Sequence, residues 1–246
     1  MKISLDKLDR LKDSLKSVTD SELRKTEDGV FDFRTLKVIQ RLISNGKIRT
    51  LENIIATGKE ANVFRAKTLD NRNRAVKIYR MNTSTFRKLA PYMEGDPRFQ
   101  DIGHKHWDRV YTWAQKEYKN LHSMWAAGVT VPKPLAVDSN VLIMEYFGWR
   151  YHPYPMVKNK HPEDPSEFFK KLMESIKKYR KVGLSHGDLS EYNILNYREN
   201  PVIIDVGQAV SKGHPMFDEM HERDRKNLYR FFRKMIPELR KEDIVS

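Results

Sequence analysis

The stretch from His186 to Asn193 constrains this chain more than any other part of it. It places Asp188 and Asn193 five positions apart, and Asp205 follows twelve residues later at the end of an apolar run. Phosphoryl transfer needs a carboxylate near the attacking oxygen, and it needs metal ions held on the phosphates. Mg²⁺ takes oxygen ligands and needs few from the protein, so Asp188 suits the first role and Asn193 with Asp205 the second. The alternative is a plain turn before a buried strand, with these residues as caps.

The composition indicates a folded chain without disulfides. The 246 residues are 39% hydrophobic, which is enough for one large domain or two lobes with real cores. No apolar run approaches the roughly 20 residues of a membrane span, and the first residues lack the apolar core of a secretory signal. There are no cysteines, which excludes thiolate metal sites and fits a reducing, cytoplasmic location.

The net charge of +13 concerns partners rather than fold. A surplus of 46 Lys and Arg over 33 Asp and Glu creates a field that attracts nucleic acid, nucleotides or anionic surfaces. Solubility of a charge-rich protein explains the surplus equally well. The charge alone leaves both interpretations open.

The periodicity changes along the chain from helical to strand-like and back. Leucines at helical spacing predict a short amphipathic helix near residues 5–15, and residues 80–107 read as a long loop of the functional or disordered kind. The further helices are expected at 32–46, 108–127, 165–182 and 218–235. The strands are expected at 51–55, 62–67, 74–79, 140–146 and 202–206.

This order of elements predicts an α+β, two-lobed fold. The expected parts are an N-terminal helical extension packing on the first lobe at 1–50, an N-lobe with an antiparallel sheet and helices at 51–146, and a helical C-lobe at 147–246. The N-lobe range includes the loop at 80–107. The region of Phe147 and Gly148 is the expected hinge.

Lys77 and Glu117 are each unusual where they stand. Lys77 lies in the middle of the strand Ala75-Val-Lys-Ile78, where lysine is a poor filler, and Glu117 falls on the apolar stripe of its helix. A lysine that binds phosphates and pairs with a helix glutamate explains both positions. The alternative for Lys77 is an edge-strand side chain that reaches solvent.

Two further segments fit a nucleotide site. The turn at Thr57, Gly58 and Lys59 joins two strands, so its backbone N–H groups can cradle phosphates, although a plain hairpin would look the same. The segment from Met144 to Phe147 ends a strand before the linker and would offer backbone groups to an adenine ring. In sequence order these parts follow the protein-kinase set, so the expected two-lobed fold is protein-kinase-like.

At this point the chain resembles a RIO-family atypical protein kinase, of the first RIO subfamily. The resemblance covers about residues 30 to 240, and two of its strings, G-K-E-A-N-V and H-G-D-L-S-E-Y-N, are highly specific. The motifs that carry it are Thr57–Val63, Val76–Tyr79, Trp113–Glu117, Leu184–Asn193 and Ile203–Gln208.

The resemblance implies a role for each matching residue. Asp188 and Asp205 would be catalytic, and Asn193 and Asp205 would hold the metal. The metal-binding Asp205 would itself accept phosphate in an ATPase switch. The nucleotide would be bound by Thr57, Lys59, Glu60, Lys77, Glu117, Met144, Glu145 and Phe147.

The resemblance also implies ATP with Mg²⁺ or Mn²⁺ as cofactors, autophosphorylation, and a role in maturation of the small ribosomal subunit and its rRNA. The autophosphorylation candidates in the loop are Thr83, Ser84 and Thr85. The short segment after Asp205 lacks the activation-loop A-P-E sequence and peptide-docking helices of ordinary protein kinases. The implied protein is a minimal, archaeal, monomeric member without a membrane partner.

Two other functions remain as alternatives. Small-molecule kinases of the aminoglycoside or choline phosphotransferase type share H-G-D-x-x-x-x-N and a later aspartate. The turn after Ala56 and the basic surplus count against them, because a cationic substrate needs an acidic cleft. The other alternative is a non-catalytic RNA-binding assembly factor, against which the complete set of catalytic residue types counts.

Overall fold

A computed structural model describes residues 4, 6, 31–81, 91–96, 98 and 106–244. The predicted N-terminal amphipathic helix and the candidates Thr83, Ser84 and Thr85 lie outside these described residues. The chain divides into two compact units. The first unit comprises Met1–Lys88, Gly103–Gln115 and Pro134–Tyr146, and the second comprises Leu89–Ile102, Lys116–Lys133 and Phe147–Ser246.

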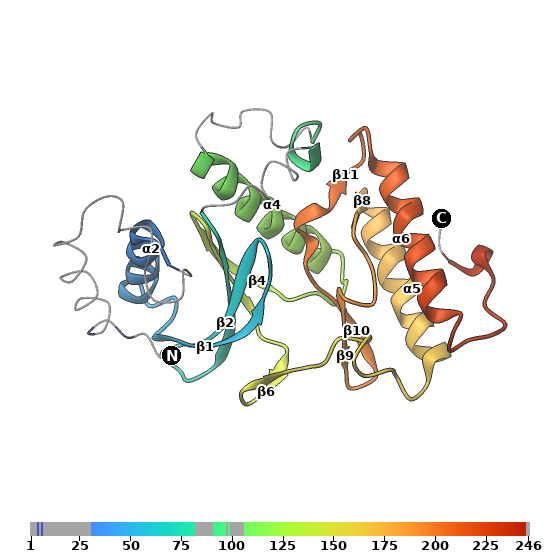
Figure 1. Cartoon of the computed structure of the whole chain (residues 1–246), viewed down its shortest axis with the longest axis horizontal. Coiled ribbons are helices and arrows are strands. Elements are labelled where there is room, and N and C mark those ends of the chain that lie inside the picture. The colour runs from blue at the N-terminus through green and yellow to red at the C-terminus, as the bar shows by residue number, and fades with distance from the viewer. Residues whose placement is uncertain are drawn as a thin grey trace. The chain divides into compact units, whose positions relative to one another are not determined.

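The first unit is built on a five-stranded antiparallel sheet with the order β1-β2-β3-β5-β4 (Figure 1). Its strands are β1 (Thr50–Thr57), β2 (Ala61–Lys67), β3 (Asn73–Tyr79), β4 (Pro134–Asp138) and β5 (Val141–Glu145). Val76 and Ile78 point from β3 into the hydrophobic core, as the alternation along this strand predicts. The core therefore lies on one face of the sheet.

Helix α2 (Phe33–Ser44) supplies the other side of that core. Its first turn is capped by Asp32, whose carboxylate accepts the N–H of Thr35 at 2.7 Å. Leu36, Ile39 and Leu42 are buried in the same core cluster as the sheet residues. The predicted helix cap and apolar stripe are both confirmed, and the helix packs against the sheet of its own unit.

The described part of the second unit holds two long helices of its own, α5 and α6, with three short ladders. Helix α5 (Pro165–Lys181) begins at the cap Asp164 with proline in its first turn, as the sequence predicts. Helix α6 (Phe217–Phe232) packs beside it, and the ring of Phe232 lies 5.1 Å from that of Phe169. The ladders pair β6 (Gly148–Trp149) with β7 (His152–Pro153), β8 (Leu184–Ser185) with β11 (Val210–Ser211), and β9 (Ile194–Tyr197) with β10 (Asn200–Ile203).

Some element boundaries differ from the prediction. Strand β1 continues to Thr57 because two register shifts let it follow β2 for longer. Strand β4 was not predicted, and β10 ends at Ile203, which leaves Asp205 beyond the strand. Helix α4 (His106–Ala126) contributes residues to both units, and 116–133 group with the second unit rather than with the predicted N-lobe. No helix in the described ranges is long and apolar enough to cross a membrane.

Candidate active site

Three of the predicted catalytic residues lie in the second unit, at the ends of its short ladders. Asp188 follows β8, Asn193 directly precedes β9, and Asp205 follows β10. Gly187 introduces this loop with a positive φ of +79°, and a Cβ there would lie 3.1 Å from the carbonyl oxygen of Gln208. Both conditions favour glycine, so the small residue before Asp188 is explained by the backbone.

The structure brings Asp188 and Asn193 into direct contact. The amide nitrogen of Asn193 donates to the main-chain oxygen of Asp188 at 2.8 Å and to its carboxylate Oδ2 at 3.2 Å. Asn193 is buried and Asp188 half-buried. The spacing of five residues therefore closes a small loop that fixes the orientation of the Asp188 carboxylate.

Asp205 has a left-handed backbone, with φ 58° and ψ 58°. Only glycine, asparagine and aspartate adopt this conformation at low cost. The side chain of Asp205 is exposed, and a short 3-10 helix η2 (Val206–Gln208) follows at once. This turn carries the carboxylate out of the buried strand to the surface of the unit.

The electrostatics of Asp188 are set by burial and by Asp205. Burial raises the pKa of Asp188, and the negative charge of Asp205 raises it further. Arg223 and the amide of Asn193 act in the opposite direction but do not cancel the shift. A carboxylate with a raised pKa is a better proton acceptor, which suits a general base.

Asp224, on α6, braces the backbone of this loop. Its two carboxylate oxygens accept the N–H groups of Gly187 at 2.8 Å and Leu189 at 2.7 Å. Burial raises the pKa of Asp224 to about 7, against the pull of these two N–H bonds. The sequence analysis did not identify Asp224. It could have done so, because Asp224 is a carboxylate on an apolar helix stripe, between Met220 and Leu228, just as Glu117 is on its own helix.

His186 joins the loop of Asp188 to the strand before Asp205. Its Nε2 lies 3.1 Å from the carbonyl oxygen of Ile204, and its Nδ1 lies 3.3 Å from the main-chain nitrogen of Asp188. The first partner can only accept and the second can only donate, which fixes the neutral Nε2–H tautomer. Burial lowers the pKa of His186 to about 4, so the ring is neutral at physiological pH.

This histidine gives the folding stability a specific pH dependence. The unfolded chain takes up a proton on His186 below about pH 6.5, whereas the folded chain does so only near pH 4, so stability falls between these values. From pH 7.5 to 5 we expect the wild type to lose about 2 kcal/mol more than His186→Gln, which keeps an N–H donor. Urea unfolding of both proteins at each pH measures this difference.

The raised pKa of Asp224 changes the folding stability in the opposite direction. Its ionised form is disfavoured in the folded state, so this residue lowers the stability as the pH rises toward 7. Asp224 is present in both proteins, so its effect cancels in the comparison. His152→Gln, at an exposed histidine, is the matched control and should follow the wild type. Parallel curves for the wild type and His186→Gln would contradict the assignment.

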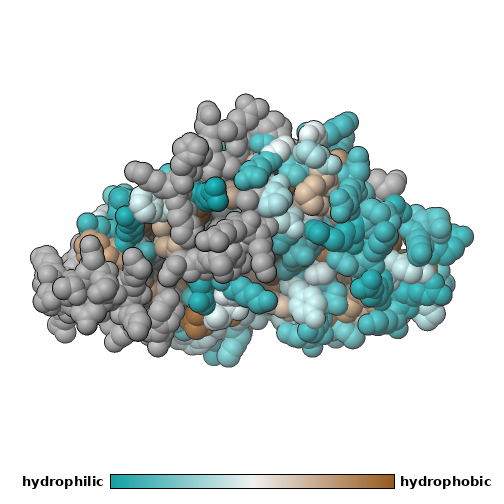
Figure 2. Space-filling view, turned by 45° about the horizontal axis from the view of Figure 1, so that its top comes forward, coloured by the Kyte–Doolittle hydropathy of each residue, from teal (hydrophilic) through white to brown (hydrophobic). Residues whose placement is uncertain are grey.

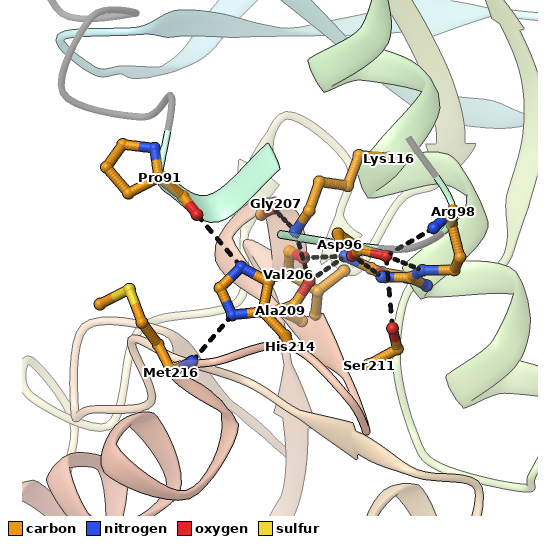
Figure 3. A network of polar contacts seen from close by, with 11 residues as sticks. Pro91, Asp96, Arg98, Lys116, Val206, Gly207, Ala209, Ser211, His214 and Met216 are labelled. Atoms are coloured by element: carbon orange, nitrogen blue, oxygen red, sulfur yellow. Dashed lines mark hydrogen bonds and ion pairs between the residues drawn. The ribbon is translucent and has the colours of Figure 1, made fainter. Parts of the chain in front are cut away.

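A buried polar network supports the turn after Asp205 (Figure 3). Lys116, on α4, is fully buried, and its Nζ donates to the carbonyl oxygens of Gly207, at 2.9 Å, and Ala209. Asn120, one turn further on, donates to the carbonyl oxygens of Val206 at 2.8 Å and Ala209 at 2.9 Å. Burial lowers the pKa of Lys116 to about 7. The two side chains therefore hold the backbone that presents Asp205.

Arg98 and Asp96 extend this network to a second segment. Arg98 Nη1 donates to Asn120 Oδ1 at 2.9 Å, which fixes the direction of that amide. Burial favours a higher pKa for Asp96, but the Arg98 guanidinium more than offsets this effect and leaves the pKa of Asp96 lowered.

Two further contacts attach this segment to the chain after the Asp205 turn. Ser211 donates to Asp96 at 3.3 Å, and His214 contacts the carbonyl oxygen of Pro91. Residues 91–96 and 98 are thereby held beside the strand that follows the Asp205 turn.

The nucleotide residues predicted from the sequence lie mainly in the first unit. Lys77 is only 9% exposed in the middle of β3, opposite Val63 and Leu142, and so does not reach solvent from an edge strand. Its Nζ lies 5.3 Å from the ring centroid of Tyr79, on the same strand. The apolar core cluster contains Val76 and Ile78, which alternate with Lys77 along β3, so the Lys77 side chain lies on the other face of the sheet.

The phosphate turn and the hinge segment also have defined positions. Thr57 and Lys59 are exposed at the tip of the β1–β2 hairpin, Glu60 is half-buried beside them, and Gly58 N–H donates to Ala61 O at 2.9 Å. Met144 and Glu145 end β5 opposite β3. The carbonyl oxygen of Phe147, in the second unit, accepts the N–H of Tyr154 at 3.0 Å.

Glu117 is 1% exposed on α4, next to Lys116. It belongs to the second unit and Lys77 to the first, so their pairing stays a prediction. Asp188, Asn193 and Asp205 lie close together in the second unit. The β1–β2 hairpin, Lys77 and the end of β5 belong to one sheet in the first unit.

Comparisons with known proteins agree on one family. Residues 62–244 match the family model of the RIO domain. The chain is 43% identical over 215 residues to the RIO-type serine/threonine-protein kinase Rio1 of Haloferax volcanii, covering 87% of this chain and 74% of that one. It is 38% identical to the Rio1 of Methanocaldococcus jannaschii, with 85% and 72% covered, and 32% identical to human RIO1, with 94% and 44% covered.

A solved structure shows the same fold. The Rio2 kinase of Chaetomium thermophilum, in an ADP/Mg²⁺-phosphoaspartate complex, superimposes with a TM-score of 0.68 at 20% identity, covering 96% of this chain and 74% of that one. This likeness confirms the predicted two-lobed kinase-like fold. The sequence relatives confirm the predicted family and subfamily. The chain belongs to the RIO family of serine/threonine-protein kinases, in its Rio1 branch.

Proposed function

We propose that this kinase uses ATP with Mg²⁺ or Mn²⁺, phosphorylates itself, and acts in maturation of the small ribosomal subunit. The observation that carries the catalytic part is the Asp188 carboxylate, held by Asn193 and raised in pKa by burial and Asp205. Asp188 would orient the attacking hydroxyl and accept its proton. Lys77 would bind the phosphates, and the Thr57–Glu60 turn would offer backbone N–H groups to them.

The residues present fit a hard divalent cation. The side-chain nitrogen of Asn193 donates to Asp188, so the side-chain oxygen Oδ1 of Asn193 is the atom that could bind a metal. The exposed carboxylate of Asp205 would be the second ligand. Within the described part of the chain, no three His, Asp or Glu side chains form a metal cluster. Two oxygen ligands suit Mg²⁺ at a nucleotide site, where phosphates and water complete the coordination. A bound cation would neutralise charge on the phosphate oxygens.

Asp205 has a second proposed role as a phosphate acceptor. The Rio2 kinase of Chaetomium thermophilum has been solved as a phosphoaspartate complex with ADP and Mg²⁺. In this chain Asp205 is exposed at the surface of its unit, on a turn fixed by Lys116 and Asn120, so its carboxylate is positioned and accessible. Transfer of the γ-phosphoryl group of ATP to an Asp205 oxygen, with release of ADP, would make the protein an ATPase switch.

The ribosomal role rests on family membership and on charge. The chain carries a net charge of +13, and rRNA is a polyanion that such a field attracts. A cytoplasmic location and a monomeric state are part of the same proposal. Cosedimentation with small ribosomal subunits of Haloferax volcanii, whose Rio1 is 43% identical, tests the partner directly. Absence of cosedimentation with and without ATP would contradict the ribosomal role.

The catalytic proposal is tested by following the γ-phosphoryl group of labelled ATP. We expect label on the protein, dependent on Mg²⁺ or Mn²⁺, and a parallel release of phosphate. Acid- and hydroxylamine-sensitivity of the label separates an acyl phosphate at Asp205 from a phosphoester on serine or threonine. Kanamycin and choline are offered in parallel, since label on either would favour the small-molecule kinase alternative. No label and no hydrolysis would favour the non-catalytic alternative.

A further inference from the structure

Helix α6 carries a concave site on the side away from the core of the second unit. The C-terminal segment folds back beside this helix (Figure 1). A cavity of about 610 Å³ is lined by residues of α6 and by Lys241 and Ile244 of that segment. Its lining residues are Glu222, Arg225, Lys226, Tyr229, Arg230, Arg233, Lys234, Lys241 and Ile244. We call this cavity the basic pocket, because six of these nine residues are Lys or Arg and only one is acidic.

The spacing along α6 explains why the cations gather on one side. Positions three and four apart share a helix face, so Lys226 and Arg230 lie together on α6 with Arg225 beside them, and Arg233 and Lys234 follow directly after the last helical residue. The opposite face holds Leu228 and Phe232, which pack into the core of the unit. The cations lie away from this core, so core packing does not explain why they gather on one side. Figure 2 shows a mainly hydrophilic surface over the C-terminal elements.

Internal ion pairs do not neutralise this charge. Glu222 pairs with Arg225 at 3.1 Å and lies 3.8 Å from Lys226. Among the residues that the structure describes, no acidic side chain pairs with the other four cations of the pocket, Arg230, Arg233, Lys234 and Lys241. Like charges this close destabilise a bare surface, so an anion bound among them would relieve the repulsion.

Tyr229 and Arg225 order the pocket. The charged groups of Arg233 and Lys241 lie 5.5 and 5.8 Å from the ring centroid of Tyr229, one from each wall. Arg225 donates to the main-chain oxygen of Lys241 at 3.3 Å and ties the C-terminal segment to α6. Its Nε is buried without a hydrogen-bond acceptor in the described part of the chain, so a donor in the pocket wall is unsatisfied.

We propose that the basic pocket is an RNA-binding site that takes the phosphodiester backbone of an RNA strand. A guanidinium group can donate two hydrogen bonds to one phosphate. Arg225, Lys226 and Arg230 extend over about 8 Å of helix, and Arg233 and Lys234 continue past its end at Phe232, which is enough for successive phosphates. The net charge of +13 extends the attraction beyond the pocket, which suits a long polyanion rather than a single nucleotide. The proposal deepens the ribosomal role, on which it rests for its biological partner.

The test measures binding of a fluorescein-labelled 20-nucleotide single-stranded RNA by anisotropy, from 0.05 to 0.3 M KCl. The triple variant R230Q/R233Q/K234Q removes three contacts, so we expect the salt slope to fall by about 2 and the affinity at 0.1 M to fall about 100-fold. Lys241→Gln, on the other wall, should weaken binding about fivefold. The matched control K170Q/K177Q/K181Q changes three exposed lysines of α5 and should stay within threefold.

Several outcomes would overturn the proposal. If the triple variant and the α5 control lose RNA affinity equally, binding depends on net charge alone. If the triple variant keeps the affinity of the wild type, the RNA binds at another part of the protein. Stronger displacement by poly-glutamate than by unlabelled RNA would favour an acidic protein partner, and displacement by ATP or inorganic phosphate at equal phosphate concentration would favour a small anion. Thermal unfolding confirms that each variant is folded.

The same samples keep this proposal separate from the catalytic one. No residue of the basic pocket belongs to the catalytic machinery, so autophosphorylation of the triple variant should equal that of the wild type. Active protein without pocket-dependent RNA binding would overturn the pocket alone. Pocket-dependent RNA binding without cosedimentation on small subunits would remove the ribosomal role and leave the pocket as an RNA site.

Discussion

Asp188→Asn is expected to lower the rate of label transfer from ATP by about 10³-fold, the size of effect that loss of a positioned general base produces. Asparagine has the shape of aspartate, and its oxygen can still accept the N–H of Asn193, so the loop should keep its geometry. What disappears is the ability to take a proton from the attacking hydroxyl. Initial rates of protein labelling and of phosphate release measure the effect.

The same substitution should not destabilise the fold. Burial and the charge of Asp205 raise the pKa of Asp188, which means that the folded state disfavours its ionised form at pH 7. A neutral asparagine removes this penalty, so the variant should unfold at the same temperature as the wild type or higher. Asp218→Asn, at an exposed aspartate of α6, is the control for both measurements. Activity within tenfold of the wild type would rule out Asp188 as the base.

Asp205→Asn is expected to reduce label transfer and hydrolysis by a similar factor, for a different reason. Asparagine tolerates the left-handed backbone that position 205 requires, so the turn should survive. The variant loses a charged metal ligand and the proposed phosphate acceptor together, and raising the Mg²⁺ concentration should restore little activity. Asp205→Ala adds backbone strain of about 1–2 kcal/mol, and lower thermal stability should distinguish it from Asp205→Asn.

The Asp205→Asn variant can also be examined by a measurement that does not depend on catalytic activity. The charge of Asp205 is one of the causes of the raised pKa of Asp188, so its removal should lower that pKa. A pH titration of the Asp188 carboxyl carbon by NMR, without added metal, measures the shift. An unchanged Asp188 titration in Asp205→Asn would show that the two carboxylates are not electrostatically coupled and would remove the basis for a shared site.

The sequence predicted those features that depend on local spacing. Asp32 and Asp164 cap their helices because an aspartate before an amphipathic segment can satisfy free N–H groups at short range. The five-residue interval between Asp188 and Asn193 likewise closes a local loop. In each case the partners lie within a few positions of one another, so no knowledge of the tertiary fold is needed.

Features that depend on distant segments escaped prediction. Strand β4, which begins at Pro134, was not predicted, because proline normally interrupts a strand. It is tolerated here because β4 is an edge strand, which has a free side on which a missing N–H costs nothing. Lys116 and Asp224 were missed although both are charged residues on buried helix faces. Their partners lie 91 and 37 residues away along the chain, at Gly207 and Gly187, and periodicity cannot identify such pairs.

The inward and outward sides of helix α6 have different roles. Asp224 faces inward and holds the backbone on both sides of Asp188, whereas its sequence neighbour Arg225 belongs to the basic pocket. Substitutions on the outward face can accumulate without altering the hydrogen bonds of the inward face. A substitution in the basic pocket would therefore change what this helix recognises and leave the loop of Asp188 in place.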